Sequence, residues 1–327
     1  MKKFLLVLTL CMISINVSAQ GLLSGLLGSD EPKGPKVKFY EGDNQAKEEI
    51  LYLKLNGVIQ EKEEDDNSIM SLRNKKSILE YLKDSLSFAA KREAIKAVYI
   101  EINSPGGEVT ASDLVYHMFK KFYSETNKPI IAHIGSMGAS GAYYAACGCT
   151  KIYALPTSMI GSIGVLLQSM NVEELASKIG IKPVTVKSDK TPMKDVLSPF
   201  REVTPEEKAM LLELVETSYQ RFVDIVSENR KLNREDVIKL ANGSVYTAQK
   251  AHKLGLVDGI GYRDEVAAEI CKMLEIKSVA FVKLAEEKNP LSELFNVFSE
   301  KNDDIRPIIN SFVKQLMIGN QPVLMFR

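Results

Sequence analysis

Short apolar runs rich in β-branched residues alternate along this chain with amphipathic segments of helical spacing, and this alternation limits the fold more than any other feature. Residues 49–59 and 95–103 have the composition of buried strands, whereas residues 77–91 between them repeat apolar side chains at helical spacing. The alternation continues with a helical segment at 112–124 and a strand at 129–134. The pattern predicts an α/β protein in which helices pack against a sheet.

The sequence around Thr204 predicts the start of a long helix. Thr204 is suited to the N-cap, Pro205 to the first helical position, and Glu207 to closing a capping box with the threonine. Apolar residues then recur at helical spacing as far as Val226, which predicts a face that packs on the core or on another subunit. A shorter helix is expected at about residues 172–179.

The two ends of the chain differ in composition from its centre. Residues 1–19 combine two lysines, an apolar run and a small-residue pattern, which predicts a secretory signal peptide; the run is shorter than the roughly 20 residues of a membrane span, so a retained anchor is the alternative. Residues 20–47, rich in glycine, proline and charge, predict a linker. The folded domain is expected at 48–285. Residues 286–327 predict a helical tail that packs on the domain or contacts a membrane surface.

The charge balance gives no sign of a nucleic-acid partner. The chain carries 42 basic and 42 acidic side chains, whereas nucleic-acid binders carry a basic surplus. The cysteines lack the CxxC spacing of zinc sites, and no metal, nucleotide or other cofactor is implied.

A glycine-rich turn, "GSMGASG", holds two serines and is the first candidate for chemistry. Ser140 follows the strand at 129–134 and opens a helix, whose unpaired N-terminal amides favour negative charge. Ser140 is therefore the candidate nucleophile, with an N-cap role as the alternative. Ser136 lies earlier in the turn, where serine is a common structural choice.

Two further features bear on a nucleophilic serine. The turn Pro105-Gly106-Gly107 ends the strand at 95–103 and exposes backbone N–H groups, which could form half of an oxyanion hole. A base is harder to find, because the chain has only three histidines.

None of the three histidines has a position that suggests catalysis. His117 lies on a helix face, His133 within a strand and His252 beyond the core. This scarcity favours lysine, which acts as a base when burial lowers its pKa.

Five sequence blocks, spread over roughly residues 49–280, together resemble one known family. In order, they are "INSPGGEV", "GSMGASGAYYAA", "MIGSIGV", "KDVLSPFREVTPEE" and "KAHKLGLVDGIG". They are similar to the signal peptide peptidase A family of serine proteases, within the superfamily shared with Clp protease and crotonase. The resemblance implies a Clp/crotonase-like α/β fold of repeated β-β-α units with a helical extension.

The resemblance also assigns roles to the catalytic side chains. The serine of the "ASG" block, Ser140, is the family's nucleophile, and the lysine before "D-x-x-S-P", Lys194, is its general base. Lys187 and Lys190 are neighbouring competitors that lack the following "DVLSP". The serine of "GSIGV", Ser162, is expected to bind and orient the base.

The same resemblance assigns the oxyanion amides to Gly107 and Gly141, with Gly106 left open. It implies an exported endopeptidase, in the bacterial periplasm or on the outer face of the inner membrane, that degrades remnant signal peptides and other apolar peptides. It also implies a homo-oligomeric ring in which serine and lysine come from neighbouring protomers.

Three alternatives differ from this interpretation in what they require of the sequence. A Clp-type peptidase would place a catalytic histidine after "ALPTSMI", where this chain has Gly161-Ser162. A crotonase-like acyl-CoA enzyme needs no serine with lysine, and its usual cytoplasmic setting conflicts with a signal peptide. A non-catalytic scaffold or binding protein that retains the fold is the third, and intact Ser140, Lys194 and Ser162 argue against it.

Overall fold

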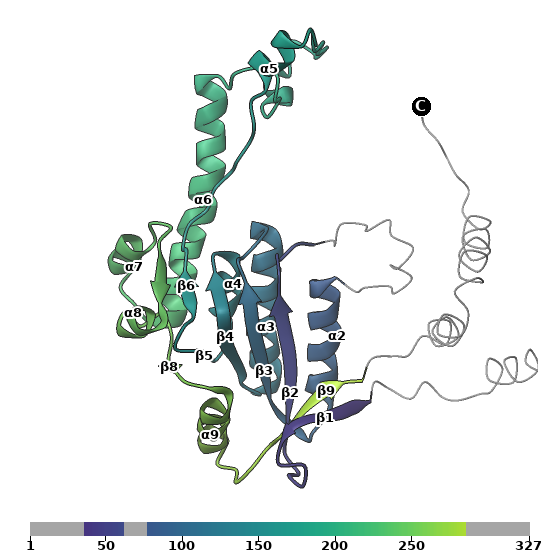
Figure 1. The fold of residues 1–327 in the computed structure, drawn as a ribbon, viewed down its shortest axis with the longest axis vertical. Helices are drawn as coiled ribbons and strands as arrows, with labels where there is room; N and C mark the ends of the chain where they lie inside the picture. The colour runs from purple at the N-terminus through teal and green to yellow at the C-terminus, as the bar shows by residue number, and fades with distance from the viewer. Residues whose placement is uncertain (1–35, 62–76, 286–327) are drawn as a thin grey trace, which may run out of the picture. The chain divides into compact units, whose positions relative to one another are not determined.

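The computed structural model describes residues 36–61 and 77–285, and a mixed sheet organises them (Figure 1). The strands are β1 (Val37–Gly42), β2 (Glu49–Asn56), β3 (Ile95–Ser104), β4 (Ile130–Ala139), β5 (Lys151–Ala154), β6 (Met159–Gly161), β7 (Val245–Thr247), β8 (Gly259–Ile260) and β9 (Ala280–Leu284). Within the described residues their order is β1-β9-β2-β3-β4-β5-β8, with β6 paired to β4 and β7 to β6. Only the β1–β9 and β6–β7 pairs are antiparallel in this part of the chain.

Within the described residues, helices form at each position where the sequence pattern predicts one, and further helices that it did not indicate follow Arg230. The helices are α2 (Ile78–Lys91), α3 (Val109–Thr126), α4 (Gly141–Ala146), α5 (Glu173–Lys178), the 3-10 turn η2 (Pro192–Asp195), α6 (Pro205–Arg230), α7 (Arg234–Leu240), α8 (Ala248–Lys253) and α9 (Arg263–Leu274). The predicted α/β class is confirmed, and the architecture agrees with a Clp/crotonase-like fold. No helix of the described ranges has both the length and the apolarity needed to cross a bilayer.

Both faces of the central strands are buried, which explains their nearly continuous apolar sequences. On β2, Leu53 faces a core cluster that includes side chains of α2, α3, α4 and α6. The next side chain toward the N-terminus, Tyr52, faces a second cluster that includes Val266 and Ile270 of α9. Because successive side chains of a strand point to opposite faces, one strand contributes to both clusters.

The sheet begins earlier than the sequence pattern indicates, because β1 forms within residues 20–47, where a linker was predicted. β1 pairs antiparallel with β9 at one edge of the sheet. Most of its side chains are exposed, so its stability comes from backbone hydrogen bonds that leave little apolar signal in the sequence. The predicted signal peptide, residues 1–19, and the predicted helical tail, residues 286–327, lie outside the described residues.

The predicted N-terminus of the long helix is confirmed. Thr204 caps α6: its Oγ1 accepts the Glu207 N–H at 3.3 Å, and the Glu207 Oε2 accepts the Thr204 N–H at 2.9 Å. The helix runs for 26 residues. Its C-terminal half packs on α4, where the Phe222 and Tyr144 rings lie 5.0 Å apart between centroids.

Residues 164–204 leave the sheet after β6 and return to the N-terminal end of α6; we call this segment the arm (Figure 1). Residues 181–190 are exposed throughout, and Val184 and Val186 expose 86% and 92% of their surface. A hydrogen bond from the Val172 N–H to the Pro199 carbonyl, 2.7 Å long, joins the outgoing and returning chains. Exposed apolar side chains are therefore concentrated on the arm.

His133 lies inside the second cluster and is held by two hydrogen bonds. Its Nε2 lies 3.0 Å from the Gly261 carbonyl oxygen, and its Nδ1 contacts the Tyr99 hydroxyl. Since a carbonyl can only accept, the proton is on Nε2, and Nδ1 accepts from Tyr99. Burial lowers the pKa of His133 and keeps the ring neutral. This histidine is therefore a structural residue.

The neutral state of His133 predicts a pH-dependent stability. In the unfolded chain this histidine binds a proton at about pH 6.5, whereas in the folded chain it does so only at lower pH. The contribution of neutral His133 to the unfolding free energy is therefore complete above about pH 6.5 and is lost as the pH falls below it. We expect His133→Gln, which retains a donor and an acceptor, to flatten the dependence of the unfolding free energy on pH between about 6.5 and 5. The exposed His117, changed to Gln, is the matched control. Identical slopes for wild type and His133→Gln in denaturant titrations would contradict this role.

Candidate active site

Ser140 lies at a sharp junction between β4 and α4. Its backbone angles are φ 50° and ψ −126°, a conformation that non-glycine residues rarely adopt and that costs about 1–3 kcal/mol. The Ser140 N–H donates to the Gly161 carbonyl of β6 at 2.8 Å, and the Ser140 carbonyl accepts from the Tyr144 N–H at 3.0 Å. The hydroxyl makes no capping hydrogen bond. The junction therefore holds the backbone of Ser140 and leaves its Oγ available.

The turn after β3 packs directly against this junction. Gly106 has φ +104°, and a Cβ at this position would lie 2.7 Å from the Gly141 nitrogen and 2.8 Å from the Ser140 Cβ. Both the backbone angle and the space thus require glycine. The two glycine-rich motifs, distant in sequence, form one site because β3 and β4 are neighbouring parallel strands.

Two backbone amides beside Ser140 are free to bind an oxyanion. Within the described residues, the N–H groups of Gly107 and Gly141 donate no hydrogen bond. A Cβ on Gly141 would lie 3.2 Å from the Gly107 nitrogen, so the two residues are in close contact. The Gly106 N–H instead donates to Ser104 Oγ at 3.1 Å. The Gly107 and Gly141 amides can serve as donors, whereas that of Gly106 is already bound.

Ser162 lies next to the residue that holds Ser140. Gly161, whose carbonyl accepts the Ser140 N–H, directly precedes it, and the Ser162 N–H donates to the Ser244 carbonyl at 2.8 Å. Ser162 also has a positive φ, 47°, and is half-buried. Pairing of β6 with both β4 and β7 thus brings the two serines into one region.

Lys194 is exposed on η2, within the arm. No hydrogen bond or ion pair joins it to Ser140 or Ser162 in the part of the chain that is described. The arm meets α6 at Glu207, whereas α6 meets α4 at Phe222; these positions are separated by roughly 22 Å of helix. One chain therefore places the two expected catalytic side chains in different regions.

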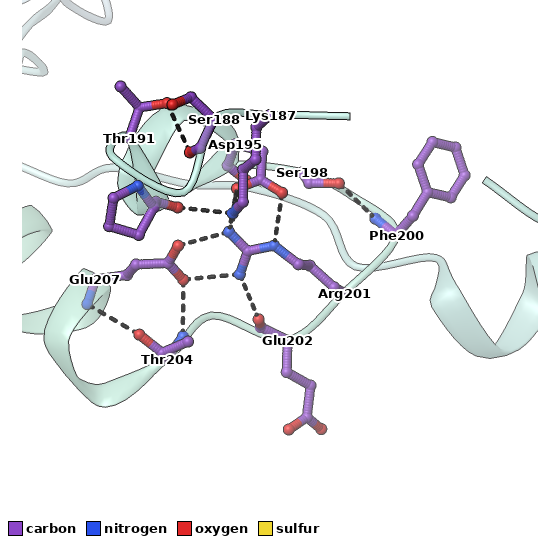
Figure 2. A network of polar contacts seen from close by, with 11 residues as sticks. Lys187, Ser188, Thr191, Asp195, Ser198, Phe200, Arg201, Glu202, Thr204 and Glu207 are labelled. Atoms are coloured by element: carbon purple, nitrogen blue, oxygen red, sulfur yellow. Dashed lines mark hydrogen bonds and ion pairs between the residues drawn. The ribbon is translucent and has the colours of Figure 1, made fainter. Parts of the chain in front are cut away.

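The competing lysine Lys187 is engaged in the arm (Figure 2). Its Nζ donates to the Pro192 carbonyl at 2.7 Å and pairs with the Asp195 carboxylate. Hydrogen bonds from Arg201 and Lys187 hold the pKa of Asp195 well below its usual range, so this partner stays ionised. Lys187 is thus engaged by two partners within the arm. Lys190, like Lys194, is exposed.

Two residues beside these groups were not identified from the sequence. Ser112 of α3 is buried, its Oγ has no partner within the described residues, and it lies 2.2 Å from where a Cβ on Gly141 would be. Arg201 binds both Asp195 and Glu207. A single serine within a helix shows no sequence pattern that points to a role in the site. Arg201 could have been noticed, because it is the only arginine of the block "KDVLSPFREVTPEE".

The packing of Gly106 predicts a selective loss of Ser140 reactivity. Gly106→Ala should lower the rate at which a fluorophosphonate labels Ser140, because the added Cβ displaces Gly141 and Ser140. Gly57→Ala is the matched control, since Gly57 has φ +76° but open space around it. Both changes should cost about 1–2 kcal/mol of unfolding free energy through the backbone. Equal labelling of the two variants would show that the turn is not part of the site.

Comparison with known proteins identifies the family. Residues 123–277 match Peptidase family S49. A putative signal peptide peptidase SppA of Enterococcus faecium is 30% identical over 75% of this chain and 72% of its own length. Putative proteases of Methanocaldococcus jannaschii and Synechocystis are 34% and 38% identical, over 61% and 58% of this chain, and the chain spans 63% and 66% of their lengths. The chain therefore belongs to peptidase family S49, the SppA family of serine proteases.

Proposed function

We propose that this protein is a serine endopeptidase with a Ser/Lys dyad, in which Ser140 is the nucleophile and Lys194 the general base. The observation that carries the proposal is the junction at Ser140, where a strained backbone leaves the hydroxyl uncapped beside the free amides of Gly107 and Gly141. Backbone strain at a half-buried serine, next to unpaired donors, suits nucleophilic catalysis.

The proposed reaction uses these groups in sequence. Neutral Lys194 takes the proton from Ser140 Oγ as the oxygen attacks a peptide carbonyl. The Gly107 and Gly141 amides stabilise the oxyanion that forms. Lys194 then protonates the leaving amine, and water hydrolyses the acyl-serine. Ser162, beside the residue that binds the Ser140 amide, orients the lysine.

A second copy of the chain supplies Lys194 in this proposal. Support comes from the separation of Ser140 and Lys194 within one chain and from the exposed apolar side chains of the arm. A head-to-tail contact joins two different surfaces, so the arm of one subunit can reach the Ser140 region of the next and close a ring.

The proposed substrates are remnant signal peptides and other apolar peptides. The Enterococcus faecium relative is named a putative signal peptide peptidase. Leu166 and Leu167, which expose 79% and 43% of their surface, follow Ser162 closely and offer apolar contacts to such a peptide. Export to the bacterial periplasm, or to the outer face of the inner membrane, rests on the predicted signal peptide at residues 1–19.

Substitution of the serines tests the chemistry. Ser140→Ala should abolish both peptide hydrolysis and fluorophosphonate labelling while leaving thermal unfolding nearly unchanged. Ser162→Ala should lower turnover less severely, by about 1–3 kcal/mol in the activation barrier, because the lysine loses one orienting hydrogen bond. A folded wild-type protein that neither cleaves peptides nor reacts with the probe would instead be a scaffold.

Co-refolding of two inactive variants tests the shared site. Ser140→Ala and Lys194→Ala proteins, unfolded and refolded together, should regain about a quarter of wild-type activity, because that fraction of random junctions pairs an intact serine with an intact lysine. Each variant refolded alone is the control. If light scattering shows co-assembly but activity does not return, the dyad forms within one chain.

A further inference from the structure

The arm carries a dense polar network centred on Arg201 (Figure 2). Its guanidinium donates to the Asp195 carboxylate through Nε at 3.1 Å and through one terminal nitrogen at 2.9 Å. The same terminal nitrogen reaches the Asp195 main-chain carbonyl at 3.0 Å. Toward α6, the two terminal nitrogens bind the Glu207 carboxylate at 2.8 and 2.5 Å. We call Arg201, Asp195 and Glu207 the Arg201 network.

Charge and burial make this network more than a surface ion pair. The Glu207 side chain is only 3% exposed, although it carries a carboxylate. Hydrogen bonds from Arg201, and then from the Thr204 backbone, lower the pKa of Glu207 to about 2. Both carboxylates are therefore ionised at neutral pH, and the guanidinium between them provides the compensating charge that a buried carboxylate needs.

The network connects a rigid element to the turn that carries Lys194. Glu207 lies in the first turn of α6, where the capping box with Thr204 fixes its backbone. Asp195 is the last residue of η2 and directly follows Lys194. Arg201 binds the main-chain carbonyl of Asp195 as well as its carboxylate, so it holds the backbone one residue after Lys194 and not only a side chain.

We propose that Arg201 is the positioning residue of the catalytic base: by clamping the Lys194 turn to the N-terminus of α6, it presents the lysine from a fixed point. This inference rests on the proposed role of Lys194. In this role Arg201 acts through the Lys194 turn and not directly on the reacting atoms.

The setting explains why such a clamp is needed. η2 has no buried residue, and residues 181–190 before it are exposed, so apolar packing cannot fix the turn within one chain. A base that reaches a serine on another subunit has to arrive in a narrow range of positions, since small displacements from hydrogen-bond distance cost large factors in rate.

Arginine is suited to this task in a way that lysine is not. Its planar fork of five N–H donors binds two carboxylates and a carbonyl together, whereas an ammonium offers three donors from one point. Arg201→Lys therefore keeps the positive charge between Asp195 and Glu207 but loses the geometry that joins them.

The test compares Arg201→Lys with wild type in the full-length, assembled protein. We expect kcat for peptide hydrolysis to fall roughly 10- to 100-fold with KM little changed, because the base is misplaced while substrate contacts remain. Glu207→Gln, which keeps the shape but loses the charge, should lower kcat in the same direction. Arg234→Lys is the matched control: Arg234 pairs with Asp224 of α6, away from the turn.

A second measurement separates positioning from general structural support. In a Lys194→Ala background, Arg201→Lys should cause no further loss in the rate of fluorophosphonate labelling at Ser140, because there is no lysine left to position. Independent, multiplicative losses would overturn the proposal. So would wild-type kcat in Arg201→Lys, or failure of that variant to assemble in light scattering, which would assign Arg201 to the fold of the arm.

The same experiments distinguish failure of this inference from failure of the proposed function. If Ser140→Ala and Lys194→Ala are inactive but Arg201→Lys has wild-type kcat, the dyad stands and the role of Arg201 is wrong. If Lys194→Ala keeps full activity, the dyad itself is wrong, and the positioning role of Arg201 is overturned with it.

Discussion

The hydrogen bond from the Ser140 amide to the Gly161 carbonyl is the contact on which the site depends. It joins the end of β4 to β6 and continues their parallel pairing by one residue, past the point where the chain turns into α4. The unfavourable φ of Ser140 persists because this bond, and the packing of Gly106 against the junction, leave the backbone no alternative. Gly141, which follows Ser140, and Ser162, which follows Gly161, take their positions from the same pairing.

A second connection links this junction to the arm. The Tyr144 hydroxyl, one helical turn after Ser140, donates to Asp113 of α3 at 2.6 Å, and Arg221 of α6 binds the same carboxylate oxygen at 2.6 Å. The helix that begins after Ser140 and the helix that supports the arm thus share one carboxylate. Together with the contact between Tyr144 and Phe222, this fixes the base of α6 against the body of the sheet. The Arg201 network performs the corresponding task at the other end of α6.

The sequence predicted those features that have a local or periodic physical cause. The central strands are buried on both faces, and the capping box at Thr204 is a short-range hydrogen-bond pattern, so both leave clear signals. β1 left none, because an exposed edge strand is held by backbone bonds to residues more than 200 positions later. Ser140 and the glycine turns could be proposed as one site from motif order, but their contact depends on the neighbouring positions of β3 and β4. The partners of Arg201 were missed because charges six residues apart, on η2, on the connecting loop and on α6, follow no helical or strand periodicity.

The exposure of Lys194 suggests a reason for dividing the proposed Ser/Lys dyad between two subunits. A lysine accepts a proton only in its neutral form, which is favoured by removal from water. Within one chain Lys194 is exposed, and the apolar side chains of the arm around it are uncovered. In the proposed assembly, the contact that covers those side chains would also bring Lys194 to Ser140 and exclude water from it. Proximity and desolvation of the base would then arise in one step, so an unassembled chain would have a formed nucleophile and oxyanion hole but no working base.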